Sequence, residues 1–219
     1  MNGGGAADGG SGIRLGDISD YTDLSDLGSV ASASLVGINL ALVGGRMGGL
    51  GGLSLNMYFD TFGIEGYLAN LALIILLFQV SRWGYTSFYN VAGSKAWSPF
   101  VFICILVGIQ LVHDLIFYHG AINVLPSGRN EMIDVLKKYA KENGARALGG
   151  HSVFLVVVAV LAMMLKESTF ITGVMITLGA VYMMPFVITT FGPKPAPPPA
   201  PPAEKKESFG MKDWNGPRY

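Results

Sequence analysis

Cysteine and charged residues are both scarce in this chain. Its 219 residues include one cysteine, Cys104, which excludes a disulfide within the chain. Asp, Glu, Lys and Arg make up only 14% of the sequence and their charges cancel, so there is no overall attraction for nucleic acid. Hydrophobic residues reach 51% and the mean hydropathy is +0.45, both too high for an ordinary soluble domain. We expect a membrane protein without a nucleic-acid partner.

Motifs that carry catalysis are also missing. The sequence has no glycine-rich phosphate-binding loop, no Gly-x-Ser-x-Gly nucleophile motif and no cysteine–histidine spacing typical of a metal site. We therefore expect no enzyme activity, no cofactor and no resident metal.

Four uncharged apolar stretches dominate the chain after residue 65. A helix needs about 20 such residues to cross a ~30 Å hydrocarbon core. The stretches cover residues 66–81, 96–113, 147–165 and 168–193. The first is short, but Arg82 can extend toward the interface, where Trp83 and Tyr85 are also favoured. The pattern predicts an all-α membrane domain of four transmembrane helices over residues 63–192.

Lys and Arg are unevenly distributed between the connections. Two lie before residue 65, five in residues 120–146 and five after residue 193. With four spans these twelve fall on one side of the membrane, whereas Arg82, Lys95 and Lys166 fall on the other. Because cytoplasmic segments carry the excess of positive charge, both termini and the long connection are predicted to be cytoplasmic.

The N-terminal arm, residues 1–62, begins with a glycine-rich leader followed by an acidic repeat. Aspartate recurs every third residue, at Asp17, Asp20, Asp23 and Asp26. This period aligns the carboxylates along one edge of a polyproline-like strand. The repeat is interpreted either as a partner-binding peptide or as a solvated acidic leader.

Residues 30–60 contain two conflicting patterns. Large apolar residues alternate with small or polar ones over 36–42 and again over 53–59, around a glycine-rich turn. Period two favours a β-like hairpin or extended pair outside the bilayer, because unpaired strand edges cannot lie in lipid. Residues 27–45, however, are uncharged for 19 residues. A fifth transmembrane helix is therefore the main alternative, and disorder is the third.

Residues 130–142 form a predicted amphipathic helix. Asn130 suits an N-cap, and apolar residues recur at helical spacing from Met132 to Ala140. The opposite face carries Lys137, Lys138 and Lys141. Such a helix is typical of the membrane interface, so we expect it to lie flat there, with its lysines toward headgroups or a partner.

The C-terminal tail, residues 193–219, is rich in proline at its start. It predicts a stiff polyproline II rod of roughly 30 Å. Aromatic residues among charges follow, as in peptides that dock through a few anchors. We interpret Pro195, Pro198 and Trp214 as partner-binding residues; a plain spacer is the alternative.

Polar residues interrupt the second and third apolar stretches. The candidates for a membrane polar cluster are Gln110, His113, Asp114, Tyr118 and His151. Ionisable groups at membrane depth are costly and often mark proton or ion pathways. The i, i+4 histidine pair of helical metal sites is missing. Mutual hydrogen bonding near a membrane boundary is therefore the favoured interpretation.

In the last apolar stretch, Thr169, Gly173 and Thr177 recur every four residues. Small residues at this spacing let helices approach closely. The stripe predicts helix packing within the bundle, with a homo-oligomer interface as the alternative.

Four blocks between residues 113 and 152 resemble one viral protein family. They are His-Asp-Leu-Ile-Phe-Tyr at 113–118, Pro-Ser-Gly-Arg-Asn at 126–130, the segment 133–140, and Gly-Gly-His-Ser at 149–152. They are similar to small multi-span membrane proteins of nucleocytoplasmic large DNA viruses, which commonly carry aspartate where this chain has His151. The resemblance covers about residues 70–190. It implies a protein of the ER-derived inner virion membrane, with capsid or minor capsid proteins as partners.

Three functions are consistent with these features. The first is a structural protein that links the inner virion membrane to the capsid shell through the N-terminal arm and the tail. The second is a small oligomeric channel or transporter that uses the face of Gln110, His113 and Asp114. The third is a membrane metalloenzyme that uses His113, His119 and His151. The missing catalytic motifs favour the first.

Overall fold

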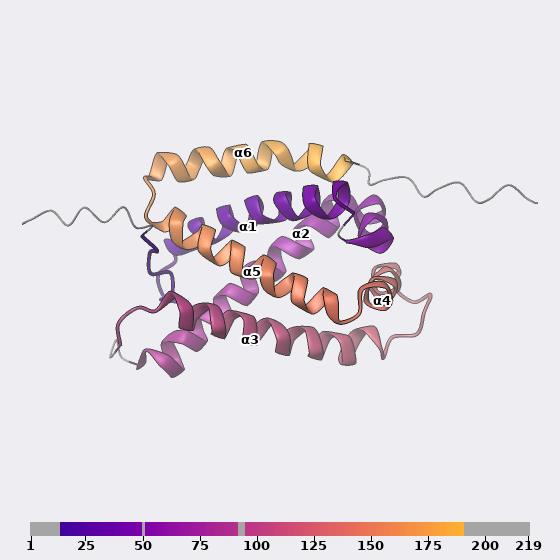
Figure 1. Ribbon diagram of the computed structural model, residues 1–219, viewed down its shortest axis with the longest axis horizontal. Helices are drawn as coiled ribbons and strands as arrows, with labels where there is room; N and C mark the ends of the chain where they lie inside the picture. The colour runs from indigo at the N-terminus through magenta and orange to yellow at the C-terminus, as the bar shows by residue number, and fades with distance from the viewer. Residues whose placement is uncertain (1–13, 50, 92–94, 191–219) are drawn as a thin grey trace, which may run out of the picture.

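The computed structural model describes residues 14–49, 51–91 and 95–190, which form six α-helices (Figure 1). No strand occurs within these residues. The helices are α1 (Asp26–Leu42), α2 (Gly52–Gly84), α3 (Pro99–Phe117), α4 (Glu131–Asn143), α5 (Ala145–Lys166) and α6 (Phe170–Thr189). Short π-helical turns extend three of them: η1 (Val43–Met47) after α1, η2 (Tyr85–Tyr89) after α2 and η4 (Tyr118–Ile122) after α3.

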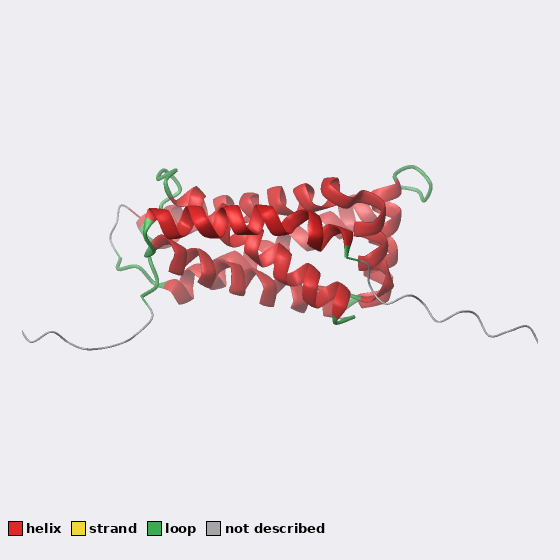
Figure 2. Ribbon diagram, turned by 90° about the horizontal axis from the view of Figure 1, so that it is seen from above, coloured by secondary structure: helices red, strands yellow, loops and turns green. Residues whose placement is uncertain are grey.

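Five helices in the described part of the chain are long and apolar enough to cross a membrane: α1, α2, α3, α5 and α6. They run along the long axis of the molecule, and α2 crosses the others obliquely (Figure 1). Helix α4 is shorter and lies across the end of this bundle, where α3 ends and α5 begins (Figures 1 and 2). The all-α prediction is confirmed, and five rather than four helices qualify as membrane spans.

The prediction of a β-like hairpin over residues 30–60 is wrong, because α1 and the first part of α2 occupy this segment. Helix α1 packs against α2, α5 and α6, so contacts surround it on several sides. Gly37 brings it close to α5: a Cβ there would lie 2.5 Å from Val158 Cγ2. In α1, small residues at such contacts alternate with large ones. This alternation has the period of two that is typical of a β-strand.

Helix α1 also changes the predicted topology. The five spans alternate in direction, and the two ends of the described chain lie at opposite ends of the bundle (Figure 1). If all five helices cross a membrane, residues 14 and 190 lie on opposite sides of it, so the prediction that both termini are on one side is not supported. Six of the 15 Lys and Arg residues lie at the α4 end of the described bundle, namely Arg46 and five in residues 120–146; five more follow α6 in the sequence, outside the described residues.

Helix α2 is too long for one membrane crossing. Its 33 residues extend about 50 Å at 1.5 Å per residue. A kink divides it at Gly63, whose φ of 47° is open to glycine at little steric cost. The part before the kink begins against α4, at the end of the bundle. The apolar part after the kink is long enough to cross the bilayer.

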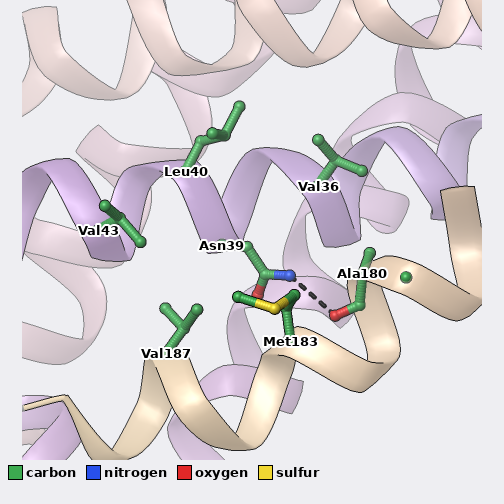
Figure 3. Close-up of a pocket in the computed structure, with 8 residues that line it drawn as sticks. Val36, Asn39, Leu40, Val43, Ala180, Met183 and Val187 are labelled. Carbon is green, nitrogen blue, oxygen red and sulfur yellow. Dashed lines mark hydrogen bonds between the residues drawn. The ribbon is translucent and has the colours of Figure 1, made fainter.

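The core lies where α1 passes between α2, α5 and α6. Its buried apolar residues include Val30, Ile38 and Leu42 of α1, Tyr67, Ile74 and Phe78 of α2, and Val158, Ala159 and Met163 of α5. Within lipid, helices associate through close packing and interhelical hydrogen bonds rather than through apolar burial alone. The central bonds involve Asn39, whose Nδ2 donates to the carbonyl oxygen of Ala180 at 2.9 Å (Figure 3). Tyr67 Oη donates to Asn39 Oδ1, also at 2.9 Å.

Candidate functional site

The predicted polar cluster forms between α3 and α5, near the α4 end of the bundle. Gln110 Nε2 donates to Asp114 Oδ2 at 2.6 Å, and Ser152 Oγ donates to Gln110 Oε1 at 2.8 Å. The Nδ1 atoms of His113 and His151 lie 3.1 and 3.2 Å from the two carboxylate oxygens of Asp114. Four of the five predicted residues therefore meet, and Asp114 is their common partner.

Helical spacing explains this convergence. Gln110 and Asp114 are four residues apart on α3, so their side chains lie on one face, one above the other. Gln110 is 1% exposed and reaches the interior, where its amide is bonded on both sides. Ser152 and His151 enter from the first turns of α5, across the helix interface. The cluster thus ties two helices by hydrogen bonds, as polar residues in bilayers commonly do.

Helix α4 contributes a residue that the sequence did not single out. The Tyr139 ring is nearly parallel to the His151 imidazole, with centroids 6.4 Å apart. Burial raises the pKa of the Tyr139 phenol, and the nearby Asp114 carboxylate raises it further. Tyr118 lies elsewhere: it is exposed and meets only the edge of His119 among aromatic neighbours. Tyr118 therefore takes no part in the hydrogen bonds of the cluster in the described residues.

The cluster has limited chemical scope. Two imidazoles and one carboxylate can share protons, yet no group of three His, Cys, Asp or Glu side chains in the described residues is placed to hold a metal ion. Toward the other end of the bundle, α3 and α5 continue with buried apolar residues: Phe102, Leu106, Leu155 and Val158. Between α3 and α5 the side-chain hydrogen bonds of the described residues are therefore found only near the α4 end.

A second polar site, at the opposite end, joins α1, α2 and α5 and was not predicted. Asp26 is 2% exposed and Arg82 is fully buried; their charged atoms lie 3.3 Å apart. Lys166 pairs with the other oxygen of Asp26. Arg82 does not extend to the interface as expected, because Asp26 and backbone carbonyl oxygens surround its guanidinium. A buried charge is stable only with such partners.

Residues 14–25, here termed the N-terminal clasp, supply those carbonyl groups. Arg82 donates to the carbonyl oxygens of Asp20 and Asp23. Thr86 Oγ1 donates to the carbonyl oxygen of Ser19 at 2.9 Å, and Trp97 Nε1 donates to that of Leu15 at 3.2 Å. The clasp therefore lies against the ends of the helices and does not extend away from them.

The acidic repeat is a series of turns rather than a polyproline-like strand. The backbone N–H groups of Ser19, Thr22 and Ser25 each donate at 2.9 Å to the aspartate two residues earlier: Asp17, Asp20 and Asp23. Aspartate followed two residues later by Ser or Thr favours this local turn. Hydrogen bonds from Thr22 and Ser25 hold the pKa values of Asp20 and Asp23 below their usual range. The period of three thus encodes repeated turns, and Asp26 begins α1.

Of the three small residues in the stripe of α6, only Thr177 forms a hydrogen bond to another helix in the described residues. Thr169 caps the helix by accepting from the Thr172 N–H at 3.2 Å, and a Cβ at Gly173 would meet nothing within 4 Å. Thr177 reaches α1, where its hydroxyl lies 2.5 Å from Ser32 Oγ. Beside this contact, an apolar groove of about 250 Å³ separates parts of α1 and α6 (Figure 3). The proposed partner-binding residues Pro195, Pro198 and Trp214 lie outside the described residues.

Comparison with known proteins adds no constraint. No protein-family model, curated protein or solved structure matches this chain. Function must therefore be argued from the bundle and its two polar sites. A signal for the missed site exists in the sequence, since Asp26, Arg82 and Lys166 each border an apolar run, and unpaired charges there are costly.

Proposed function

We propose that this chain is a non-enzymatic structural protein of an inner virion membrane, linking that membrane to the capsid shell through its C-terminal tail. One observation carries the proposal: α4, the basic connection between α3 and α5, and the end of α6 lie at the same end of the bundle. The charge rule makes this the cytoplasmic end. In viruses of the family that the chain resembles, the cytoplasmic face of the ER-derived membrane turns toward the shell.

The internal bonding of the bundle supports a structural role. Buried Arg82 is paired with Asp26, buried Asn39 with Ala180, and buried Gln110 with Asp114. Each of these polar groups holds two parts of the described bundle together or orders one helix face. Hydrogen bonds between packed helices hold a bundle in one arrangement. A rigid anchor in the bilayer is what a membrane-to-shell linker requires.

The proposed linkage uses one arm rather than two. The N-terminal clasp is bonded to the bundle at the end opposite α4, so it does not face the same neighbour as the tail. The contact with capsid or minor capsid proteins is therefore assigned to residues after 190. Pro195, Pro198 and Trp214 remain the proposed contact residues.

Cross-linking in purified virions tests the proposal. Full-length protein should fractionate with the inner membrane and cross-link to a capsid protein, and a variant lacking residues 193–219 should stay in the membrane but lose the cross-link. A second variant replaces residues 193–202 by a Gly-Ser segment of equal length; it removes Pro195 and Pro198 but keeps Trp214, so its cross-link should be weakened rather than lost. Absence of the protein from particles, or a tail inside the membrane-enclosed lumen, would overturn the proposal.

A channel or transporter is the second candidate, because Asp114 and its two histidines lie within a helix pair of membrane-spanning length. A path through one chain would have to cross the apolar contacts beyond Gln110, so several copies would have to form the pore. Proton flux into vesicles that contain the protein tests this function. Flux that Asp114→Asn abolishes and Tyr118→Phe leaves intact would establish it; equal, background flux in all three proteins would exclude it.

A further inference from the structure

Helix α4 packs one face against the protein and exposes the other. Its Ile133 and Val135 side chains are buried, and the helix packs against α2. Asn130 caps it by accepting from the Ile133 N–H at 3.0 Å, as the sequence predicts. The helix lies across the long axis of the bundle (Figures 1 and 2). A bilayer that surrounds the five apolar helices would therefore have α4 along its surface.

Two of the three carboxylates of α4, those of Asp134 and Glu142, accept hydrogen bonds from backbone N–H groups. Asp134 Oδ2 accepts from the Gly128 N–H at 2.7 Å. Glu142 accepts from two backbone N–H groups at the start of α2. These contacts pair two of the helix's negative charges with backbone N–H groups.

The basic side chains of α4 differ in their contacts. Lys137 Nζ donates to the carbonyl oxygen of Leu125, which directs it to the preceding loop. Lys138 and Lys141 are exposed and form no ion pair within the described residues. Three residues apart, they are neighbours on one helix face. Arg129 just before α4 and Arg146 just after it are also exposed and unpaired in this part of the chain.

We propose that these four side chains form a binding surface for the phosphate headgroups of anionic phospholipids. The surface, here termed the basic face, comprises Arg129, Lys138, Lys141 and Arg146. Its charge is complementary to phosphate, and the position of α4 across the bundle end places it at headgroup depth. Each basic residue near an anionic membrane surface raises affinity about five-fold. The inference depends on membrane insertion alone and is independent of the partner of the tail.

Lipid titration of the purified full-length protein in detergent tests the basic face. The probes are short-chain phosphatidylserine and short-chain phosphatidylcholine, and binding is measured by native mass spectrometry. Phosphatidylserine should bind at least ten-fold more tightly than phosphatidylcholine, and Lys138→Gln with Lys141→Gln should weaken it about 25-fold, at about five-fold per lysine. Lys138→Arg with Lys141→Arg should keep the affinity within about two-fold, because the charge is retained.

The matched control removes two exposed charges from the other end of the protein. Arg14→Gln with Lys95→Gln should leave phosphatidylserine affinity unchanged, and circular dichroism verifies the fold of every variant. Equal binding of the two lipids, or equal losses in the control and the lysine variant, would overturn the proposal. Displacement of the lipid by equimolar inorganic phosphate would assign the surface to free phosphate instead. Unchanged lipid binding together with a lost capsid cross-link in the lysine variant would assign it to a protein partner.

Discussion

Glu142 of α4 caps helix α2 through Ser54 and its neighbour. One carboxylate oxygen accepts from the Ser54 N–H and the other from the Leu53 N–H, each at 2.9 Å. The first amides of a helix have no partner within it, so a carboxylate there satisfies them and complements the helix dipole. The contact joins residues 88 positions apart and fixes α4 across the bundle end.

Glu142→Gln should destabilise the protein in a pH-dependent way. Hydrogen bonds from Ser54 hold the pKa of Glu142 below its usual value. The carboxylate's contribution is therefore complete above the unfolded-state pKa of about 4.3 and is lost as pH falls through the lower folded-state pKa. We expect a loss of roughly 0.5–1 kcal/mol at pH 7, because Glu142 is exposed to solvent, and almost none at pH 3. Thermal unfolding in detergent at both pH values measures it. Glu131→Gln, on the same helix, should show a smaller difference.

Asp26→Asn should be among the most damaging single substitutions in the described bundle. It removes the carboxylate that pairs with Arg82 and Lys166. Arg82 then keeps only uncharged acceptors, and Lys166 keeps only the longer contact with Asp23 at 3.8 Å. Breaking a buried ion pair in this way costs about 3–5 kcal/mol. Asp20→Asn serves as the control, because asparagine keeps the turn and Asp20 forms no ion pair in the described residues. Thermolysin cleavage of the N-terminal clasp should accelerate in the first variant only; equal rates would contradict the assigned role.

Gly37→Ala should weaken the contact between α1 and α5. The added Cβ would lie 2.5 Å from Val158 Cγ2, so one helix must shift, at a cost of about 1–3 kcal/mol. Gly28→Ala is the matched control on the same helix, since its Cβ meets nothing within 4 Å and alanine favours the helix. The melting temperature should fall for Gly37→Ala and stay level or rise for Gly28→Ala. Adding Val158→Ala to the first variant should recover part of the loss.

The two ends of the described bundle should react from opposite sides of a membrane. A background variant, Cys104→Ser, removes the native thiol, and Tyr21→Cys or Lys138→Cys then introduces one label site in the clasp or on α4. Both positions are exposed. In sealed vesicles of uniform orientation, a membrane-impermeant maleimide should label only one of the two variants until detergent is added. Labelling of both from outside would mean that α1 does not cross the bilayer.

Local sequence patterns were reliable where one helix decides the outcome alone. The cap at Asn130 and the end near Gly144 bracket α4 as predicted, because both depend on contacts within a few residues. The α3, α5 and α6 regions followed from apolar length alone. By contrast, the alternation in residues 36–42 misled the assignment of α1, because a helix that touches three neighbours carries no single apolar stripe.

The two polar sites also combine features that the local sequence predicted with features that depend on tertiary packing. Gln110 and Asp114 could be grouped by their spacing on one helix, and His151 joined them through a motif at the next span. Tyr139 and Ser152 entered the cluster only through the packing of α4 and α5 on α3. The acidic repeat was recognised as a regular feature, but its turns and its bonds to Arg82 depend on where the clasp lies.

The sequence alone determined that this chain has apolar helices of membrane length and a strongly asymmetric positive charge, since hydropathy and composition need no knowledge of neighbours. Only the tertiary structure decided that α1 joins the bundle and that Arg82 turns inward. The physical reason is distance along the chain: Asp26 meets Arg82 across 56 residues and Lys166 across 140. Such partners become adjacent only after the helices have packed.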